Sequence, residues 1–209
     1  TRQATAQIFA MAGRVTKRDE KTAAAIFESL LLTGIAMSFT KTSRPGSGTE
    51  HIMAHFWECM ELLDSKTPNY HGEDVGVTTL IMLRYYEALA RLPQVTAHPE
   101  ICNWDEIYSI YGPLAPDVQK LNTPDTITDG IAPRWIEACW PQIRRIVQSV
   151  PSYDACLAAM RQAGCKTTIE EVGKAPDFVD ISFRFHPYMR RRLSLKRVSH
   201  MLDLPEDLF

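Results

Sequence analysis

The chain has 209 residues, with 45% hydrophobic and 23% charged residues and a formal net charge of −2. This length allows a sizeable buried core, and the composition is that of an ordinary soluble globular protein. The small net charge does not favour nucleic acid or an anionic membrane as a partner. No apolar run approaches the roughly 20 residues that span a bilayer, and no signal-peptide pattern opens the chain, so we expect a cytoplasmic protein without a membrane span.

Helical periodicity dominates the first half of the sequence. Residues 16–40 repeat apolar side chains at helical spacing, and Thr16 and Asp19 have the spacing of a capping box at the start. A second helix is predicted from position 47 or 49 to position 63. A third is predicted over 71–92, where the proline at position 93 ends it.

The second half is more broken. Between residues 94 and 132 four prolines interrupt short helical pieces, and the helical period resumes over 132–150 and 152–164, the latter closed by a glycine. One or two further helices are expected over 186–204. We find no alternating β pattern, internal repeat or low-complexity linker, so the sequence predicts a single all-α domain of about eight to ten helices over residues 1–209.

Glycine and cysteine patterns narrow the chemistry. The ten glycines form no GxGxxG and no GxxxxGK[ST] string, so no nucleotide-binding βαβ unit is predicted within the chain. The cysteines show no CxxC pair and are odd in number, which favours reduced thiols over a zinc–cysteine site. They are Cys59, Cys102, Cys139, Cys156 and Cys165.

Three histidines are spaced so that they can meet. His51 and His55 share a helix face, and a helix over 50–64 carries the chain about 20 Å away at 1.5 Å per residue. The six residues 65–70 include a proline and can return roughly 20 Å in an extended conformation. His71 can therefore lie beside His51. Imidazoles suit a divalent transition metal, although an i, i+4 histidine pair also occurs without any function.

The loop that precedes this helix, "SRPGSG", has the character of an anion site. It leads to a helix N-terminus, where free backbone N–H groups and the helix dipole favour negative charge. Ser43, Arg44 and Ser47 are suitable phosphate partners. A plain turn followed by a helix cap is the structural alternative. Together, the loop and the histidines suggest a small phosphorylated polyol as substrate.

The strings "SRPGSGTEHIMAHFW" and "HGEDVGVTTL" resemble the C-terminal helical domain of the sn-glycerol-1-phosphate dehydrogenase family, notably its bacterial AraM-type members. This family lies in the superfamily of glycerol dehydrogenase, iron-dependent alcohol dehydrogenase and dehydroquinate synthase. The strings "ESLLLTGIAMSFT" and "RRRLSLKRVSHMLDL" are also similar in pattern. The resemblance covers nearly the whole chain and is weak between about 95 and 130.

The resemblance implies a two-domain enzyme of phospholipid biosynthesis. An N-terminal α/β domain would bind NAD or NADP, and the helical domain would bind a divalent metal (zinc, nickel or iron) through one Asp and two His. The substrate, dihydroxyacetone phosphate or glycerol 1-phosphate, would lie between the domains. By motif, the ligands correspond to His51 and His71, while His55 corresponds to the catalytic and substrate-binding histidine.

The chain also departs from the family pattern. The ligand Asp and the nucleotide domain of the family lie upstream of this sequence, so we expect a fragment that is inactive by itself and can form a homo-oligomer. Two alternatives remain. One is another polyol dehydrogenase, or a cyclase or lyase, of the same superfamily. The other is a helical interaction domain without catalysis.

The remaining conspicuous residues have structural interpretations. The basic cluster 190–197 is expected on a solvated helix face, with contact to phosphate or to the other domain as the alternative. Glu73 is expected to support the helix start or to orient His71. His186 and His200 are expected to be structural. A buried position is predicted for the aromatic residues Tyr85, Tyr86, Trp135 and Trp140.

Overall fold

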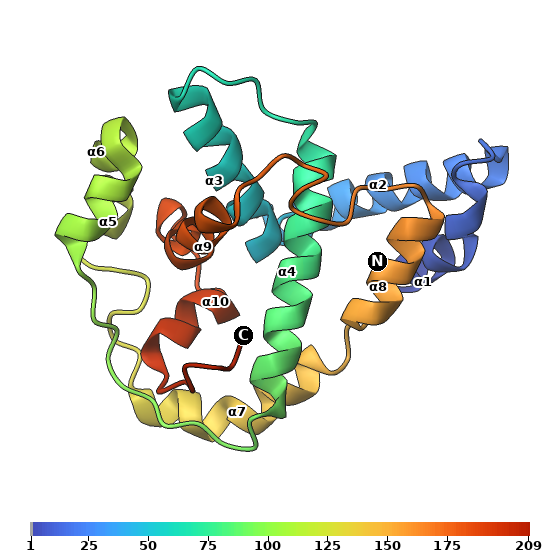
Figure 1. Cartoon of the computed structure of the whole chain (residues 1–209). Coiled ribbons are helices and arrows are strands. Elements are labelled where there is room, and N and C mark those ends of the chain that lie inside the picture. The colour runs from blue at the N-terminus through green and yellow to red at the C-terminus, as the bar shows by residue number, and fades with distance from the viewer. Residues whose placement is uncertain (1) are drawn as a thin grey trace.

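The protein is an assembly of helices around one antiparallel helix pair (Figure 1). The computed structural model describes residues 2–209, and within that range it contains no strand, only an isolated antiparallel bridge between Ala97 and Leu202. The all-α prediction is confirmed. The α-helices are α1 (Arg2–Met11), α2 (Glu20–Thr40), α3 (Thr49–Leu63), α4 (His71–Arg91), α5 (Trp104–Tyr111), α6 (Ala115–Asn122), α7 (Pro133–Val147), α8 (Tyr153–Gln162), α9 (Pro176–Phe185) and α10 (Leu195–Val198).

The second and third predicted helices match α3 and α4 closely, whereas the start of α2 differs from the capping-box prediction. Asp19, and not Thr16, is the N-cap residue: its carboxylate accepts hydrogen bonds from the backbone N–H of Thr22 at 2.9 Å and from the Thr22 hydroxyl at 2.8 Å. These bonds hold the pKa of Asp19 below its usual value. A left-handed residue at Arg18 turns the chain just before the cap.

The core lies between α3, α4 and the segment 176–201. Met53, Phe56 and Trp57 of α3 are fully buried, and the indole N–H of Trp57 donates to the hydroxyl of Ser182 in α9 at 2.7 Å. A second cluster joins α4 to α7 and to the C-terminal segment, with Tyr85, Leu89, Trp140 and Met201 at its centre. The buried aromatic positions are largely as predicted, but Trp135 is exposed on α7.

The helix α9 is absent from the predicted elements, and the basic cluster is a solvated face only in part, since Arg190 and Arg191 are exposed. Pro176 is the first residue of α9, where a missing N–H does no harm, and no side chain caps this ten-residue helix. In the cluster, Lys196 and Arg197 are buried, with Arg197 paired to Glu100 at 2.8 Å. Tertiary packing, which the local pattern does not report, places them inside.

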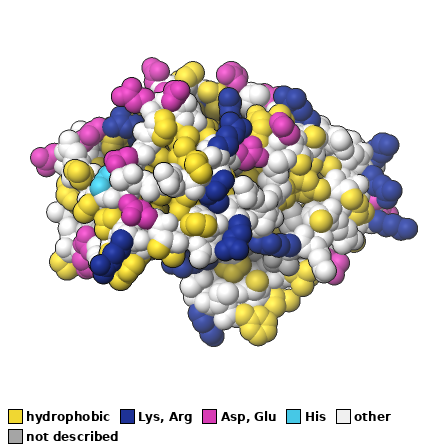
Figure 2. All heavy atoms as spheres, turned by 90° about the horizontal axis from the view of Figure 1, so that it is seen from below, with side chains coloured by type: hydrophobic (Ala, Val, Ile, Leu, Met, Phe, Trp, Pro, Cys, Tyr) yellow, Lys and Arg dark blue, Asp and Glu magenta, His cyan; other side chains and the backbone are white. Residues whose placement is uncertain are grey.

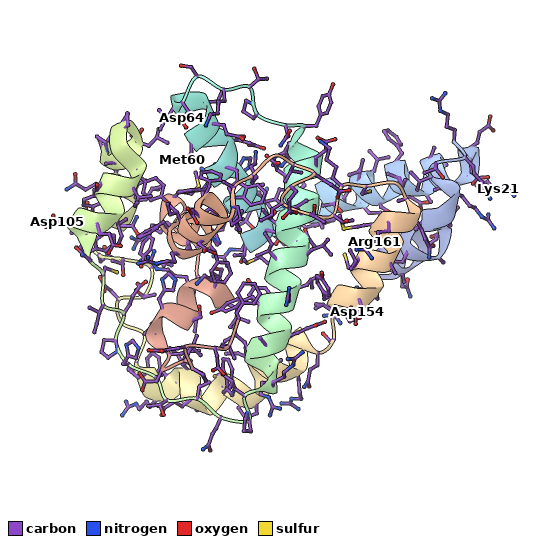
Figure 3. The ribbon with its side chains drawn as sticks, in the orientation of Figure 1. Lys21, Met60, Asp64, Asp105, Asp154 and Arg161 are labelled. Carbon is purple, nitrogen blue, oxygen red and sulfur yellow. The ribbon has the colours of Figure 1, made fainter. Side chains whose placement is uncertain are left out.

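The helix α2 projects from the body and is largely uncovered. In Figure 3, Lys21 lies at its outer end, and Figure 2 shows a group of Lys and Arg side chains toward the same end of the molecule. Within residues 2–209, α2 alone is long and apolar enough to cross a membrane, with 11% of its apolar stretch buried, so the expectation that no such run exists was wrong. Its exposed large hydrophobic residues are Phe27, Leu30, Leu31, Leu32, Ile35 and Phe39.

Candidate metal and anion site

The three histidines that the fold-back geometry predicts do lie together, where α3 faces the start of α4. The ring centroids of His51 and His71 are 5.3 Å apart. The rings of His55 and His71 are stacked, with centroids 4.8 Å apart and an interplanar angle of 20°. Residues separated by 16 and 20 positions in the sequence therefore form one cluster of imidazoles.

The connection between α3 and α4 explains how His71 is placed. Figure 3 shows Asp64 at the end of α3, where the chain leaves the helix and crosses to α4. Asn69 anchors the far end of this crossing, because its amide donates to the carbonyl of Val172 at 2.8 Å and to the carboxylate of Asp74 at 3.1 Å. His71 is the first residue of α4, directly after the anchored segment.

Carboxylates hold one ring nitrogen of every histidine in the cluster. Glu58 of α3 bonds to Nδ1 of His55 at 2.9 Å through one oxygen and to Nδ1 of His71 at 2.5 Å through the other. Glu50 bonds to Nδ1 of His51 at 3.1 Å. An ionised carboxylate can only accept, so each Nδ1 carries a proton, and in the neutral form of each ring the lone pair is then on Nε2.

Both carboxylates are held in the ionised form. Partial burial alone favours the neutral acid at Glu58, but hydrogen bonds from His71 and His55 outweigh it and hold the pKa of Glu58 below its usual value. At Glu50 burial also favours the neutral acid, but the bonds from His51 and from the backbone outweigh it and lower the pKa of Glu50. The two glutamates thus supply negative charge beside three imidazoles.

Two side chains of α4 fix the first turn of α3. The hydroxyl of Thr78 donates to the carbonyl of Glu50 at 2.9 Å, and the hydroxyl of Tyr86 donates to Oγ1 of Thr49 at 2.9 Å. Thr78 is fully buried. These bonds join the first turn of α3, next to His51, to the middle and later turns of α4.

A buried ion cluster fixes the same helix pair farther along. Lys174 lies 2.5 Å from Glu61 of α3 and 3.5 Å from Asp74 of α4, and its side chain is 1% exposed. One carboxylate oxygen of each acid, Oε2 of Glu61 and Oδ2 of Asp74, has no hydrogen-bond partner. Burial raises the pKa of Asp74, against the bond from Asn69 and the charge of Lys174.

Two glycines of the "SRPGSG" loop, Gly46 and Gly48, lie so close to neighbouring side chains that a β-carbon would clash with them. A β-carbon at Gly46 would lie 2.8 Å from Cγ2 of Thr33 in α2, and one at Gly48 would lie 2.5 Å from Oε2 of Glu50. The backbone N–H of Gly48, the N-cap residue of α3, donates to Oε1 of Glu50 at 3.0 Å. Glu50 therefore connects the end of the loop to His51.

Arg192 holds the loop from the opposite side. Its guanidinium donates to the carbonyl of Ser47 and to the hydroxyl of Ser43. Burial lowers the pKa of Arg192, and repulsion from Arg190 and Arg44 adds to this effect. Arg192 therefore contacts both serines of the loop, and Arg44 and Arg190 are near enough to repel its charge.

The donor atoms fit a divalent metal ion. One ligand atom from each of His55, Glu58 and His71 can be chosen so that all three lie within 4.8 Å of one another. The ring of His51 lies 5.3 Å from that of His71, although His51 is not a member of this triad. Nitrogen and carboxylate oxygen are the donor types that zinc, iron and nickel accept in proteins.

The structure brings the three histidines together and places Ser43 and Ser47 on Arg192; the contacts of Glu58 and Arg192 were not among the predicted ones. Glu58 lies one helical turn after His55, a spacing that could have identified it. Arg192 is 149 residues from Ser43 and belongs to the basic cluster for which contact with phosphate or with the other domain was the alternative expectation. Glu73 does not orient His71, because its carboxylate is paired with Lys166 at 2.8 Å.

The histidines outside the cluster have structural partners, as expected. His186 is fully buried and its Nδ1 bonds to the carbonyl of Ser182 at 2.8 Å. His200 lies 3.1 Å from the hydroxyl of Tyr188 and 3.2 Å from Nζ of Lys196. The five cysteines are free thiols.

The chain is similar in sequence to a group of curated proteins that share one name. The chain is homologous to curated proteins named glycerol-1-phosphate dehydrogenase [NAD(P)+], and the match falls in the C-terminal domain of that family. The chain spans about two fifths of the length of these relatives. No family model matches the chain, and no solved structure matches it significantly.

The similarity extends along most of the chain. The protein from Geobacillus stearothermophilus is 27% identical over 184 residues, which cover 88% of this chain and 39% of the relative. The protein from Bacillus subtilis is 26% identical over 174 residues, covering 83% of this chain and 34% of the relative. A shorter match to the Thermococcus kodakarensis protein is 39% identical over 64 residues.

Proposed function

We propose that residues 1–209 form the metal- and substrate-binding domain of a longer, NAD- or NADP-dependent glycerol-1-phosphate dehydrogenase. This enzyme would interconvert dihydroxyacetone phosphate and glycerol 1-phosphate in the cytoplasm, as a step of phospholipid biosynthesis. One observation carries the proposal: three imidazoles lie together, and Glu50 bonds both to His51 and to the end of a serine loop that Arg192 contacts. The relatives' name supplies the reaction.

The metal part of the proposal assigns His51 and His71 as ligands. Their Nδ1 atoms are bonded to carboxylates, so the nitrogen left for a metal is Nε2 in both residues. A bound zinc, nickel or iron ion would polarise the carbonyl or alcohol oxygen of the substrate. His55, stacked on His71, is placed to orient a substrate hydroxyl or to move its proton.

The substrate part assigns the phosphate to the loop. Ser43 and Ser47 offer hydroxyls, Arg44 offers a guanidinium, and the N-terminus of the 15-residue helix α3 adds its dipole. Arg192 contacts both serines and adds a positive charge to the same place. Since α3 begins at this loop and carries His51 and His55, a small substrate could reach both the phosphate contacts and the imidazoles.

The remaining part of the enzyme is a proposed partner. The relatives are more than twice as long as the matched region, and a nucleotide-binding domain in the additional length would supply NAD or NADP. The exposed apolar side chains of α2 offer such a domain a surface of Phe, Leu and Ile residues. Burial of these side chains would be favourable by roughly 25 cal/mol per Å² of apolar surface.

The test measures NADH and NADPH oxidation with dihydroxyacetone phosphate, using a full-length protein that contains this chain. We expect activity that a chelator removes and a divalent metal restores. The variant His71→Ala should lose activity, while the control His98→Ala, which removes a loop histidine bonded to the carbonyl of Pro99, should keep it. Activity that survives both the chelator and His71→Ala would refute the metal role.

The 209-residue chain provides a second test. We expect it to show no turnover, because the hydride carrier has no binding unit among its predicted elements. Measurable dehydrogenase activity of this chain alone would contradict the two-domain proposal.

A further inference from the structure

Glu58 differs from every other acid near the cluster because it contacts two histidines at once. Its two carboxylate oxygens each accept one hydrogen bond, from Nδ1 of His55 and from Nδ1 of His71. His55 precedes it by one helical turn, while His71 comes from the other helix. The Glu58 side chain is 19% exposed, against 36% for His55 and 44% for His71, so it is the least exposed of the three.

We propose that Glu58 is the positioning residue of this site, which sets the tautomer and the orientation of both His55 and His71. This inference rests on the proposed metal centre and deepens it. A carboxylate that accepts from both Nδ1–H groups forces both rings into the same tautomer, with the lone pair on Nε2. It also fixes the rings in their stacked arrangement, 4.8 Å apart.

Glu58 therefore sets the Nε2 atoms of two histidines that have different proposed roles. The Nε2 of His71 is left as a metal donor, and the hydrogen bond at Nδ1 makes it a more basic one. The Nε2 of His55 is left facing away from Glu58, free for a substrate hydroxyl. Because one carboxylate sets both rings, its loss affects both residues together.

The variant Glu58→Gln tests this role with almost no change in shape. An amide has one accepting oxygen and one donating NH₂ group, so it can accept from only one of the two Nδ1–H groups. The other histidine must then accept at Nδ1 and carry its proton on Nε2, which blocks that nitrogen. The control is Glu73→Gln, which removes the same charge two residues from His71 but contacts Lys166 and none of the three histidines.

The first measurement is the ring ¹⁵N NMR spectrum of the metal-free 209-residue chain at pH 8, where a free imidazole is neutral. We expect Nδ1–H tautomers at both His55 and His71 in the wild type and in Glu73→Gln, and an Nε2–H tautomer at one of them in Glu58→Gln. An Nε2–H tautomer at His55 or His71 in the wild type would overturn the proposal, and this spectrum needs no variant to fold.

The second measurement is the Zn²⁺ affinity of a full-length protein that contains this chain, determined by competition with a chromophoric chelator. We expect Glu58→Gln to bind Zn²⁺ about 10- to 100-fold more weakly than the wild type, and Glu73→Gln to bind within a factor of two or three of it. Equal affinity of Glu58→Gln and the wild type would refute the positioning role. The expected tautomers together with no Zn²⁺ binding by the wild type would refute the metal centre and leave the role of Glu58 intact.

Discussion

Removal of the Lys174 ammonium should destabilise the helix pair that carries the histidines. Lys174 is buried and lies between Glu61 of α3 and Asp74 of α4. At an effective dielectric constant of about 20, two unit charges 3.5 Å apart attract by roughly 5 kcal/mol before desolvation is counted. Because Lys174→Met leaves two carboxylates without their counter-charge in a buried site, we expect a loss of about 3–5 kcal/mol in the free energy of unfolding.

The assay is equilibrium urea denaturation at pH 7, followed by circular dichroism. The matched control is Lys166→Met, which breaks the partly exposed pair with Glu73 and should change the free energy of unfolding by about 0.2–1 kcal/mol. Neutralising both acids in the Lys174→Met background, by Glu61→Gln and Asp74→Asn, should restore most of the loss.

The effect should also depend on pH in a fixed direction. Burial already raises the pKa of Asp74 in the wild type, and loss of the Lys174 charge raises it further. A proton bound only by the native state stabilises the protein as pH falls, so the penalty of Lys174→Met should be smaller at pH 5 than at pH 8. A penalty below about 1 kcal/mol at pH 7, no larger than that of Lys166→Met, would refute the reasoning.

Three further predictions concern the loop and the buried histidine. Gly48→Ala should push the flexible Glu50 carboxylate away from its position, because the added β-carbon would lie too close to it. Zn²⁺ affinity should fall severalfold, while the free energy of unfolding should change by less than about 1 kcal/mol. Unchanged Zn²⁺ affinity would contradict this. Arg192→Gln removes charged hydrogen bonds to the serine loop that are worth about 1.5–3 kcal/mol each. Hydrogen exchange over residues 43–47 should therefore accelerate, and the KM of the full-length enzyme for dihydroxyacetone phosphate should rise about tenfold or more. Unaltered exchange would exclude the contact. Burial lowers the pKa of His186 to about 3, so between pH 6.5 and 3 the unfolded chain takes up a proton there that the native protein does not. The free energy of unfolding of the wild type should therefore fall as pH falls through this window, and His186→Asn should reduce the slope of that free energy against pH by up to about 1.4 kcal/mol per pH unit. Equal slopes in the two proteins would refute the assignment.

Local sequence signals were reliable where a helix is long and amphipathic. The bounds of α3 and α4 follow from apolar spacing, a glycine-rich entry and a terminating proline, and the structure confirms them within a residue or two. The prediction was wrong where a residue's surroundings are set by distant chain. The segment 190–197 has the composition of a solvated face, yet Arg197 is buried because Glu100, nearly a hundred residues earlier, pairs with it.

The sequence by itself determined the helical class and the helix pair, and it showed that His71 can return to His51, because periodicity fixes the helices and chain length limits how far the connection can reach. Only the tertiary structure decided how the histidines are held. Glu58 joins two helices through its two oxygens, and Arg192 approaches the serine loop from the far end of the chain. Hydrogen bonds between segments distant in sequence depend on how the whole core packs, which no local pattern records.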